Sequence, residues 1–297
     1  MSSESYSNFH GEDVAPSPPE KALFHVIPVP YEKSVSYGTG TAGGPDAILQ
    51  ASSQLELFTT GHIPAEHGIY TTPPVDCTGT CEEVLTRITD RVDTALELQK
   101  IPVVLGGEHT VTCGVIPSLK KQFDSFGVVQ FDAHADLRDS YEGSQYSHAC
   151  VMRRIHEQGV AIYQLGTRSY SFEEHTYRIS NNIPFRDSEN IWRDGHAFEL
   201  PADFPDKVFI TFDVDALDSA VMPATGTPVP GGLNWYQAMW LLEEIMKNRI
   251  CVGFDVVEFA PIEHLHGASF TAAQLVYNIM GYLAGSGQNR RYHQIGS

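Results

Sequence analysis

Short, continuous apolar runs alternate along this chain with longer segments that carry helical patterns. The apolar runs occupy residues 24–29, 103–105, 126–131, 161–166, 208–212 and 251–257. The helical segments occupy residues 45–58, 81–100, 109–123, 147–159, 233–248 and 270–285. A strand that is apolar on both of its faces must be covered on both faces, which is typical of parallel sheets flanked by helices. The pattern therefore predicts an α/β fold with a mainly parallel central sheet.

Polar clusters directly follow four of the apolar runs. Gly106 to His109 follow the second run, the D-x-H-x-D sequence at 132–136 follows the third, Asp213 to Asp215 follow the fifth, and Glu258 follows the sixth. Alternate residues of an extended chain point to the same side, so the three polar residues of D-x-H-x-D can converge on one point. Parallel sheets bind ligands beyond the carboxyl ends of their strands. We therefore expect one functional site at that edge.

These clusters have the composition of a two-metal site. The candidate metal ligands are two imidazoles and four carboxylates: His109, Asp132, His134, Asp136, Asp213 and Asp215. Burying four carboxylates together without a cation costs several kcal/mol each, so they either take up protons or bind metal. They are too many for one catalytic zinc ion but suit two ions that share bridging carboxylates. Oxygen-rich ligation with some imidazole favours manganese, so we expect two Mn²⁺ ions per chain.

The charge and cysteine content restrict the partners and the compartment. The chain has 19 basic and 37 acidic side chains, a formal charge of -18, which repels nucleic acid and anionic membranes and favours small cations. It has nothing close to the roughly 18 consecutive apolar residues of a membrane span. Five cysteines, an odd number, without a secretory signal point to the cytoplasm. Cys77 and Cys81 could be half of a zinc site, but no second pair follows at the required spacing.

The N-terminus differs in composition from the rest of the chain. Residues 1–20 are polar, rich in Ser and Pro, and aperiodic, so we expect a mobile N-terminal arm. A length of 297 residues allows one large domain or two ordinary ones. We expect residues 21–297 to form a single domain.

Five motifs in this chain resemble the ureohydrolase family, which includes arginases, agmatinases and formimidoylglutamases. They are SYGTGTAGGPDAIL, VLGGEHT, FDAHADLRD, FDVDALDSAVMPATGTPVPGG and DVVEFAP, and the likeness extends from about residue 24 to residue 285. The resemblance implies a three-layer α/β/α sandwich of the arginase type, assembled as a homotrimer or homohexamer. It also implies two manganese ions bridged by hydroxide.

The resemblance further implies how the ligands are shared and which groups take part in the reaction. By this resemblance, Asp132 and Asp213 would bridge both metal ions. The other four ligands would form two pairs, one for each ion: His109 with Asp136, and His134 with Asp215.

The hydroxide would attack the carbon of a guanidinium ion, because the metals lower the pKa of water. Asp136 would pass a proton to the departing amine. His148, in YSHACVMRR, matches a histidine that shuttles protons, and Glu258 would hold the guanidinium through two parallel N–H bonds. The products would be urea and a primary amine. For Asp255 we expect only indirect support of the site.

Departures from the arginase pattern point to a substrate with an amine tail. Arginases commonly carry G-x-R-D-x-D, whose second Asp helps to bind the α-amino group, but this chain has GTRSYS, with Ser169 and Ser171 at the Asp positions. The loop LRDSYEGSQYS lacks Asn and carries Asp139 and Glu142, which we expect to bind the amine, with Tyr141 along the alkyl chain. SHA followed by CVMRR also resembles a subgroup of bacterial agmatinases. We therefore expect hydrolysis of agmatine to urea and putrescine.

Other activities stay open at this point. Aminopropylagmatine is a close alternative, and guanidinobutyrate becomes one if Arg138 faces the pocket. Formimidoylglutamase and arginase activities fit the acidic loop less well. A one-zinc deacetylase of related fold needs fewer ligands than are present, and a noncatalytic regulatory homologue usually lacks one of them.

Overall fold

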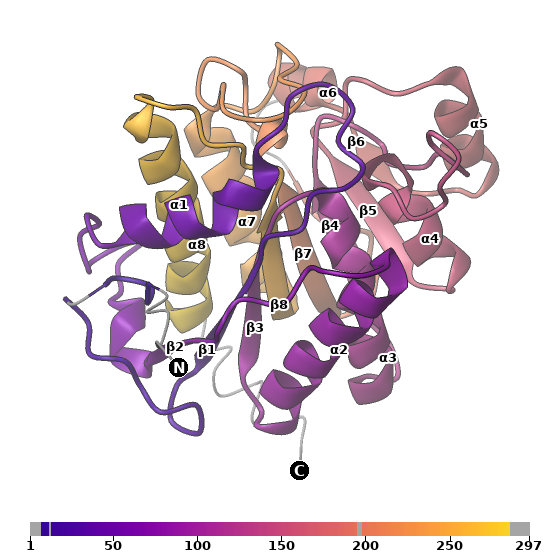
Figure 1. Cartoon of the computed structure of the whole chain (residues 1–297). Coiled ribbons are helices and arrows are strands. Elements are labelled where there is room, and N and C mark those ends of the chain that lie inside the picture. The colour runs from indigo at the N-terminus through magenta and orange to yellow at the C-terminus, as the bar shows by residue number, and fades with distance from the viewer. Residues whose placement is uncertain (1–6, 12, 195–197, 286–297) are drawn as a thin grey trace.

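The computed structural model describes residues 7–11, 13–194 and 198–285, which build one parallel sheet with helices on both faces (Figure 1). The eight strands within these residues are β1 (Phe24–Val29), β2 (Ile69–Thr71), β3 (Ile101–Gly106), β4 (Gly127–Phe131), β5 (Ala161–Leu165), β6 (Phe185–Arg186), β7 (Lys207–Asp213) and β8 (Ile250–Val257). Their order across the sheet is β2-β1-β3-β8-β7-β4-β5-β6, and each neighbouring pair is parallel. The parallel sheet predicted from the apolar runs is confirmed.

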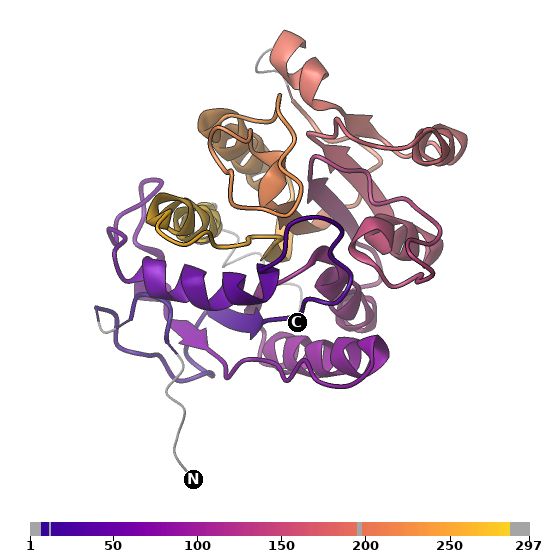
Figure 2. The same cartoon turned by 45° about the horizontal axis from the view of Figure 1, so that its top comes forward.

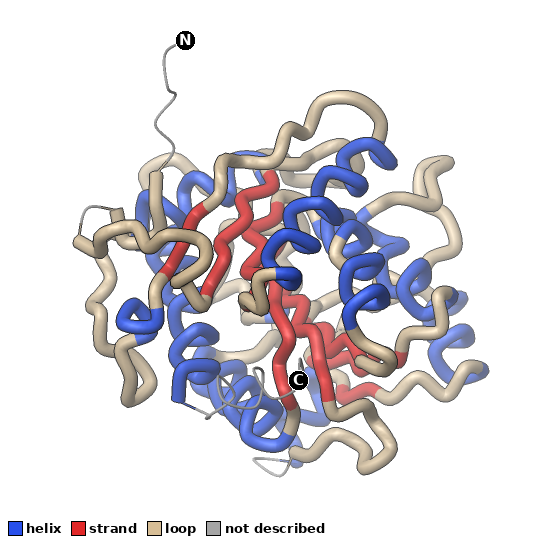
Figure 3. Tube along the Cα trace, turned by 90° about the horizontal axis from the view of Figure 1, so that it is seen from below, coloured by secondary structure: helices blue, strands red, loops and turns tan. Residues whose placement is uncertain are grey.

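The helices form the two outer layers of the sandwich. The α-helices are α1 (Gly44–Ser52), α2 (Cys81–Glu97), α3 (Ile116–Gln122), α4 (Val151–Glu157), α5 (Phe172–Ser180), α6 (Ser188–Asp194), α7 (Trp235–Asn248) and α8 (His266–Gly285). Short 3-10 helices are η1 (Thr41–Gly43), η2 (Pro64–His67), η3 (His109–Gly114), η4 (His148–Cys150) and η5 (Val214–Ala216). Helices α1, α7 and α8 cover one face of the sheet, and α2, α3 and α4 cover the other (Figures 1 and 2). The view from below also has helices on both sides of the strands (Figure 3).

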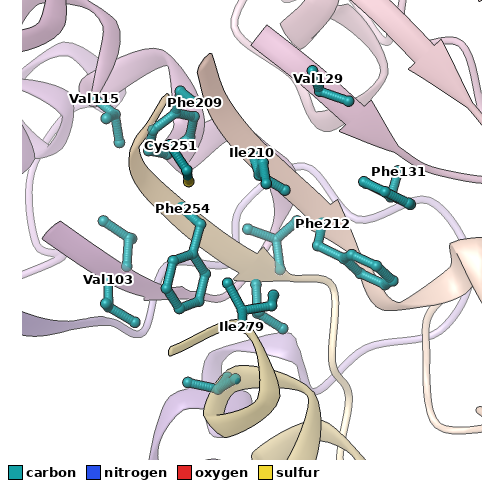
Figure 4. Packing of buried hydrophobic residues seen from close by; sticks show 14 of the residues in the cluster. Val103, Val115, Val129, Phe131, Phe209, Ile210, Phe212, Cys251, Phe254 and Ile279 are labelled. Atoms are coloured by element: carbon teal, nitrogen blue, oxygen red, sulfur yellow. The ribbon is translucent and has the colours of Figure 1, made fainter. Parts of the chain in front are cut away.

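The middle of the sheet is buried on both faces, as the apolar runs require. Phe209 and Ile210 are adjacent in β7, so their side chains point to opposite faces, and both are fully buried (Figure 4). Phe212 stacks on Phe131 of β4 with ring centroids 4.9 Å apart. Burying a side chain of this size contributes roughly 1.5–3 kcal/mol, so these central strands form a stable platform for the residues that follow them.

Prolines explain two differences between the predicted and observed elements. The segment 109–123, expected to be one helix, is divided into η3 and α3, because Pro117 lies in the first turn of α3 and cannot donate a hydrogen bond within a longer helix. Pro102, expected to precede its strand, lies inside β3. Gly253 of the neighbouring β8 leaves room for it, since a Cβ at Gly253 would be 2.8 Å from Pro102 Cγ.

Two strands and two α-helices were not predicted: β2, β6, α5 and α6. Strands β2 and β6 have three and two residues, too few for an alternating or apolar pattern. Helix α5 begins with a capping box in which Ser171 and Glu174 cap each other's backbone N–H groups. That S-x-x-E sequence, Ser171 to Glu174, is a local signal for the start of this helix.

Part of the predicted N-terminal arm packs on the domain. Phe9 and His10 are 2% and 1% exposed, and the His10 ring lies 4.3 Å from that of Tyr277 in α8. The backbone N–H of Phe9 donates to Thr71 Oγ1, and that of His10 donates to Ser52 Oγ. Residues 1–6 and 12 lie outside the described residues, and the mobility of the arm beyond Phe9 and His10 stays a prediction.

Candidate active site

A cavity of about 290 Å³ opens beyond the carboxyl ends of four neighbouring strands, β3, β8, β7 and β4. Predicted site residues from all four strand ends line it: His109, His134, Asp136, Tyr141, His148, Asp213, Asp215 and Glu258. Asp132 lies beneath this lining and is fully buried. Because β8 and β7 are inserted between β3 and β4, residues that are up to 149 positions apart meet at one edge of the sheet.

The first group of candidate metal ligands surrounds His109. Its Nδ1 atom lies 2.9 Å from Asp136 Oδ2, 3.2 Å from Asp132 Oδ2 and 3.7 Å from Asp213 Oδ2. The second group surrounds His134, whose Nδ1 lies 3.0 Å from Asp215 Oδ2 and 3.5 Å from Asp132 Oδ1. Asp132 therefore turns one oxygen to each group, as a bridging carboxylate must.

Asp213 is oriented differently from Asp132. Its Oδ2 atom faces His109, whereas its Oδ1 atom accepts the backbone N–H of Asp215 at 2.9 Å. Asp215 Oδ1 in turn accepts the N–H of Ala133. The bond from Ala133 joins the residues that follow β4 to those that follow β7, so it holds the two acidic sequences side by side.

The two groups fit a pair of divalent cations. Within the described residues, the buried Nδ1 atom of His109 has no hydrogen-bond partner, although carboxylate oxygens surround it. Its other nitrogen, Nε2, hydrogen-bonds with Thr211 Oγ1 at 2.8 Å. If Nε2 carries the ring proton, the Nδ1 lone pair faces the same point as the carboxylates, which is the arrangement of a metal ligand.

The electrostatics of the cluster lead to the same conclusion. Burial, together with the charges of Asp215 and Asp132, raises the pKa of Asp213 well above its ordinary value, and burial with the charge of Asp132 raises that of Asp136 to about 7. Burial opposes a charge on His134, but Asp215 and Asp132 outweigh it and raise its pKa to about 11. Without a cation the cluster retains protons, and divalent ions replace such protons.

Glu258 lies beside the first group and is held in an unusual backbone conformation. Its φ angle is 63° and that of Asp136 is 51°, both in the left-handed region that non-glycine residues rarely adopt. Glu258 Oε1 accepts the backbone N–H of His109 at 2.7 Å, and the N–H of Glu258 donates to Gly107 O at 2.8 Å. Burial raises the pKa of Glu258 to about 8, and a cation bound beside it would favour its ionised form.

Asp255 lies below the ligands, at the position where indirect support was expected. It is fully buried and accepts a hydrogen bond from Thr112 Oγ1 at 2.8 Å. Thr112 Oγ1 is 3.4 Å from Thr211 Oγ1, the hydroxyl that contacts His109. Asp255 therefore belongs to the network that fixes the His109 ring.

Two of the predicted substrate-binding residues are not brought into the cavity. Asp139 does not line it; its side chain is 64% exposed and pairs with Arg154 at 2.7 Å. Glu142 lies at the exposed tip of a tight turn, in which Tyr141 and Ser144 exchange backbone hydrogen bonds. Tyr141 does line the cavity, and its ring meets that of His148 at a centroid distance of 5.5 Å.

The structure provides a different carboxylate on the side of the cavity formed by residues 169–174. Glu174 is almost fully buried, lines the cavity, and accepts the backbone N–H groups of Leu137 and Ser171. Arg138 also lines it, with its Nε atom 3.8 Å from Glu174 Oε2. Ser169 and Ser171 complete this side. The capping box of α5 was the sequence signal that would have found Glu174.

Cys77 and Cys81 belong to neither of the two candidate metal groups found among the described residues. Both are half-buried, and burial raises the pKa of each thiol. The structure therefore offers no sign of the partial zinc site considered from the sequence.

Comparison with known proteins identifies the family. A sequence model of the arginase family matches residues 22–281. The chain belongs to the arginase family. An N(1)-aminopropylagmatine ureohydrolase of Synechocystis sp. is 36% identical over 272 residues, covering 86% of this chain and 88% of that protein. An agmatinase of Pyrococcus horikoshii is 34% identical over 270 residues, covering 89% and 93%.

Solved structures of arginase-family proteins share the fold. The agmatine ureohydrolase of Thermoplasma volcanium has a TM-score of 0.86 to this structure at 29% identity, covering 98% of both chains. The arginase-like fold and the enzyme class predicted from the sequence, a hydrolase acting on guanidino compounds, are confirmed at the level of the family. Among the residues that the structure describes, no helix is long and apolar enough to cross a membrane.

Proposed function

We propose that this arginase-family chain hydrolyses the guanidino group of agmatine or of N(1)-aminopropylagmatine, releasing urea and putrescine or the longer amine. The observation that carries the proposal is Glu174, a buried carboxylate in the same cavity as Glu258 and the candidate metal groups. The cavity thus offers one carboxylate for the guanidinium and a second for an amine. Relatives named for these two substrates, at 36% and 34% identity, support the assignment.

The cavity residues have separate roles in the proposed reaction. Glu258 accepts N–H bonds from the planar guanidinium and orients its carbon toward the metal groups. Asp136, whose pKa is raised to about 7, carries a proton to the departing amine, and His148 exchanges that amine's proton with solvent. Tyr141 contacts the alkyl chain, and Glu174 binds its terminal or internal amine.

Two manganese ions are proposed as the cofactor. When bound, they would lower the pKa of water and supply hydroxide at neutral pH. The candidate ligands divide into the two groups that two ions need, with Asp132 turned to both. Metal analysis of the purified protein tests this: about two manganese ions per chain are expected, whereas one zinc ion would favour the deacetylase chemistry and none a noncatalytic homologue.

A second substrate class follows from Arg138. Its guanidinium lies beside Glu174 and over the Tyr141 ring, 5.5 Å from the ring centroid, so it stands at the cavity wall where a carboxylate tail could meet it. Guanidinobutyrate has such a tail. Arginine needs groups for both an amine and a carboxylate, and formimidoylglutamate needs mainly cationic groups, which a cavity this rich in carboxylates supplies poorly.

Substrate competition decides between these possibilities. Manganese-loaded protein would be offered arginine, agmatine, aminopropylagmatine, guanidinobutyrate and formimidoylglutamate, with release of urea or formamide measured. We expect kcat/KM to be highest for agmatine or aminopropylagmatine. A higher kcat/KM for guanidinobutyrate would indicate that Arg138 binds the carboxylate tail of the substrate. A higher kcat/KM for arginine or formimidoylglutamate would overturn the proposal.

We also propose a homotrimer or homohexamer in the cytoplasm. The likeness to the ureohydrolase motifs supports the assembly, and an odd number of cysteines, five, fits a reducing compartment. Neither nucleic acid nor membrane is expected as a partner, because the net charge is -18. Light scattering of the purified protein would measure the number of chains, and a monomer would contradict the assembly.

A further inference from the structure

A hydrogen-bond network outside the metal groups connects Glu108 to His148. Glu108 is fully buried and accepts four hydrogen bonds, so both of its oxygens are occupied. Its Oε2 atom accepts the backbone N–H groups of Lys33 and Ser34, each at 2.6 Å. Its Oε1 atom accepts the hydroxyls of Ser34 and Thr110, each at 2.7 Å. Glu108 thereby fixes the segment that contains Ser34 over the end of β3.

Ser34 joins this carboxylate to the His148 ring. Its Oγ atom lies 3.2 Å from His148 Nδ1 and also accepts the backbone N–H of His148 at 3.1 Å. A serine hydroxyl has one hydrogen to donate, and an ionised carboxylate can only accept. The Ser34 hydrogen is therefore committed to Glu108, and Ser34 Oγ can only accept from Nδ1. It follows that Nδ1 carries the ring proton.

The other contacts of the ring agree with this assignment. Ser147 Oγ, 3.4 Å from Nδ1, can accept from the same N–H. Ser36 Oγ lies 3.4 Å from Nε2, and a serine hydroxyl can donate to an unprotonated nitrogen. Ser36 and His148 both line the cavity. The nitrogen left free to gain and lose a proton is thus Nε2.

We propose that Ser34 and Glu108 are positioning residues that hold His148 as its Nδ1–H tautomer, so that Nε2 exchanges protons with the amine leaving group. The role of Nε2 in proton exchange rests on the proposed hydrolysis, but the tautomer of His148 does not depend on that activity. The proposal gives a role to Glu108, a buried carboxylate that belongs to neither candidate metal group.

Three substitutions test whether the Ser34 hydroxyl sets the His148 tautomer or only packs against the ring. Ser34→Ala removes the hydroxyl but leaves both backbone N–H bonds to Glu108, so the tautomer is no longer imposed. Ser34→Thr retains a hydroxyl and should restore it. Ser147→Ala is the matched control, because it removes the other hydroxyl near Nδ1 and should leave the tautomer unchanged.

Glu108→Gln should reverse the tautomer. The glutamine carbonyl would take the Oε2 position, where two backbone N–H groups need an acceptor, so its NH₂ would take the Oε1 position. That NH₂ donates to Ser34 Oγ and releases the serine hydrogen, which can then donate to His148 Nδ1. The ring proton would move to Nε2.

Long-range ¹H–¹⁵N NMR spectra of the full-length protein report the His148 tautomer directly. The protein would be loaded with diamagnetic Mg²⁺ in place of Mn²⁺, and the His148 signals would be assigned by comparison with the His148→Gln variant. Burial lowers the pKa of His148, so the ring is neutral at about pH 8, well above the ordinary histidine value of roughly 6.5. We expect Nδ1–H in the wild type, Ser34→Thr and Ser147→Ala, a mixture in Ser34→Ala, and Nε2–H in Glu108→Gln. Nε2–H in the wild type, or one tautomer throughout the set, would overturn the proposal.

The kinetic arm uses manganese-loaded protein with agmatine and aminopropylagmatine. Ser34→Ala should lower kcat about tenfold or more, within the range for proton transfer by a positioned group, with KM changed less than about twofold, and Ser34→Thr should recover most of the loss. An unchanged kcat in Ser34→Ala would overturn the catalytic part. If the wild type itself released no urea, the proposed function would fail, while the spectra would still decide whether Ser34 and Glu108 set the tautomer.

Discussion

The buried ion pair between Arg178 and Asp187 makes a quantitative prediction about the wall of the cavity. Arg178 is fully buried in α5, and its Nη1 and Nη2 atoms donate to the two carboxylate oxygens of Asp187 at 2.9 and 3.1 Å. Its guanidinium lies between the rings of Tyr170 and Phe185, at 4.5 and 3.6 Å from their centroids. Tyr170 also donates its hydroxyl to Asp187 and lines the cavity.

Asp187→Asn removes the charge but retains the shape. Removing one partner of a buried ion pair costs about 3–5 kcal/mol, because the other charge is left uncompensated, and Arg178 is 0% exposed. The asparagine oxygen can still accept one hydrogen bond, which offsets about 1 kcal/mol. We therefore expect the free energy of unfolding to fall by about 2–4 kcal/mol. Adding Arg178→Met should recover part of this loss, since no buried charge then remains.

Urea denaturation followed by circular dichroism would measure these differences, with KM for agmatine as a second readout. KM should rise in Asp187→Asn because Tyr170 loses a hydrogen bond that orients it in the cavity wall. The matched control is Glu189→Gln, whose pair with Arg193 is exposed and is worth at most about 0.5 kcal/mol. A loss below about 1 kcal/mol in Asp187→Asn, or a double variant less stable than the single one, would refute this reasoning.

The remaining predictions concern the cavity carboxylates and the buried His10. Asp136→Asn should abolish urea release and reduce bound manganese; near-normal turnover would contradict its role. Glu258→Gln should lower kcat/KM for agmatine more than about tenfold, since a charge-assisted hydrogen bond is worth roughly 1.5–3 kcal/mol, and unchanged kinetics would remove it from the guanidinium site. Glu174→Gln should raise KM about tenfold for agmatine but not for guanidinobutyrate, which has no amine; equal rises would exclude amine binding. Burial lowers the pKa of His10 from 6.5 to about 4, so its neutral ring contributes stability above pH 6.5 that is lost as the pH falls toward 4. In urea titrations over that range, His10→Gln should therefore lose less stability than the wild type, and equal losses would contradict the assignment.

The candidate metal groups could be predicted from the sequence because each candidate ligand lies at the end of an apolar run or within a few residues of it. Asp213 is the last residue of β7, and Asp132 and His109 follow β4 and β3 within three residues; the carboxyl ends of these strands all face the same edge of a parallel sheet. The sequence does not reveal that β8 and β7 lie between β3 and β4. That order brings the three strand ends together, and it results from long-range pairing that no local pattern encodes.

The residues proposed to recognise the amine could not be located in the same way. Asp139 and Glu142 lie in an acidic loop close to the metal motif, yet Arg154 holds the first outside the cavity and a tight turn exposes the second. Glu174, thirty-five residues beyond Asp139, fills the position instead. In a loop, the direction of a side chain depends on the partners that the tertiary structure brings to it.

The sequence alone therefore determined the class of sheet, the candidate metal ligands and the chemistry they suit, since strand periodicity and strand-end positions are local properties. The tertiary structure decided which carboxylates share the cavity and how His148 is oriented. Ser34, which contacts His148 across 114 residues of sequence, illustrates the reason. Its role arises from one hydroxyl placed between Glu108 and an imidazole, and only the packed loops define that geometry.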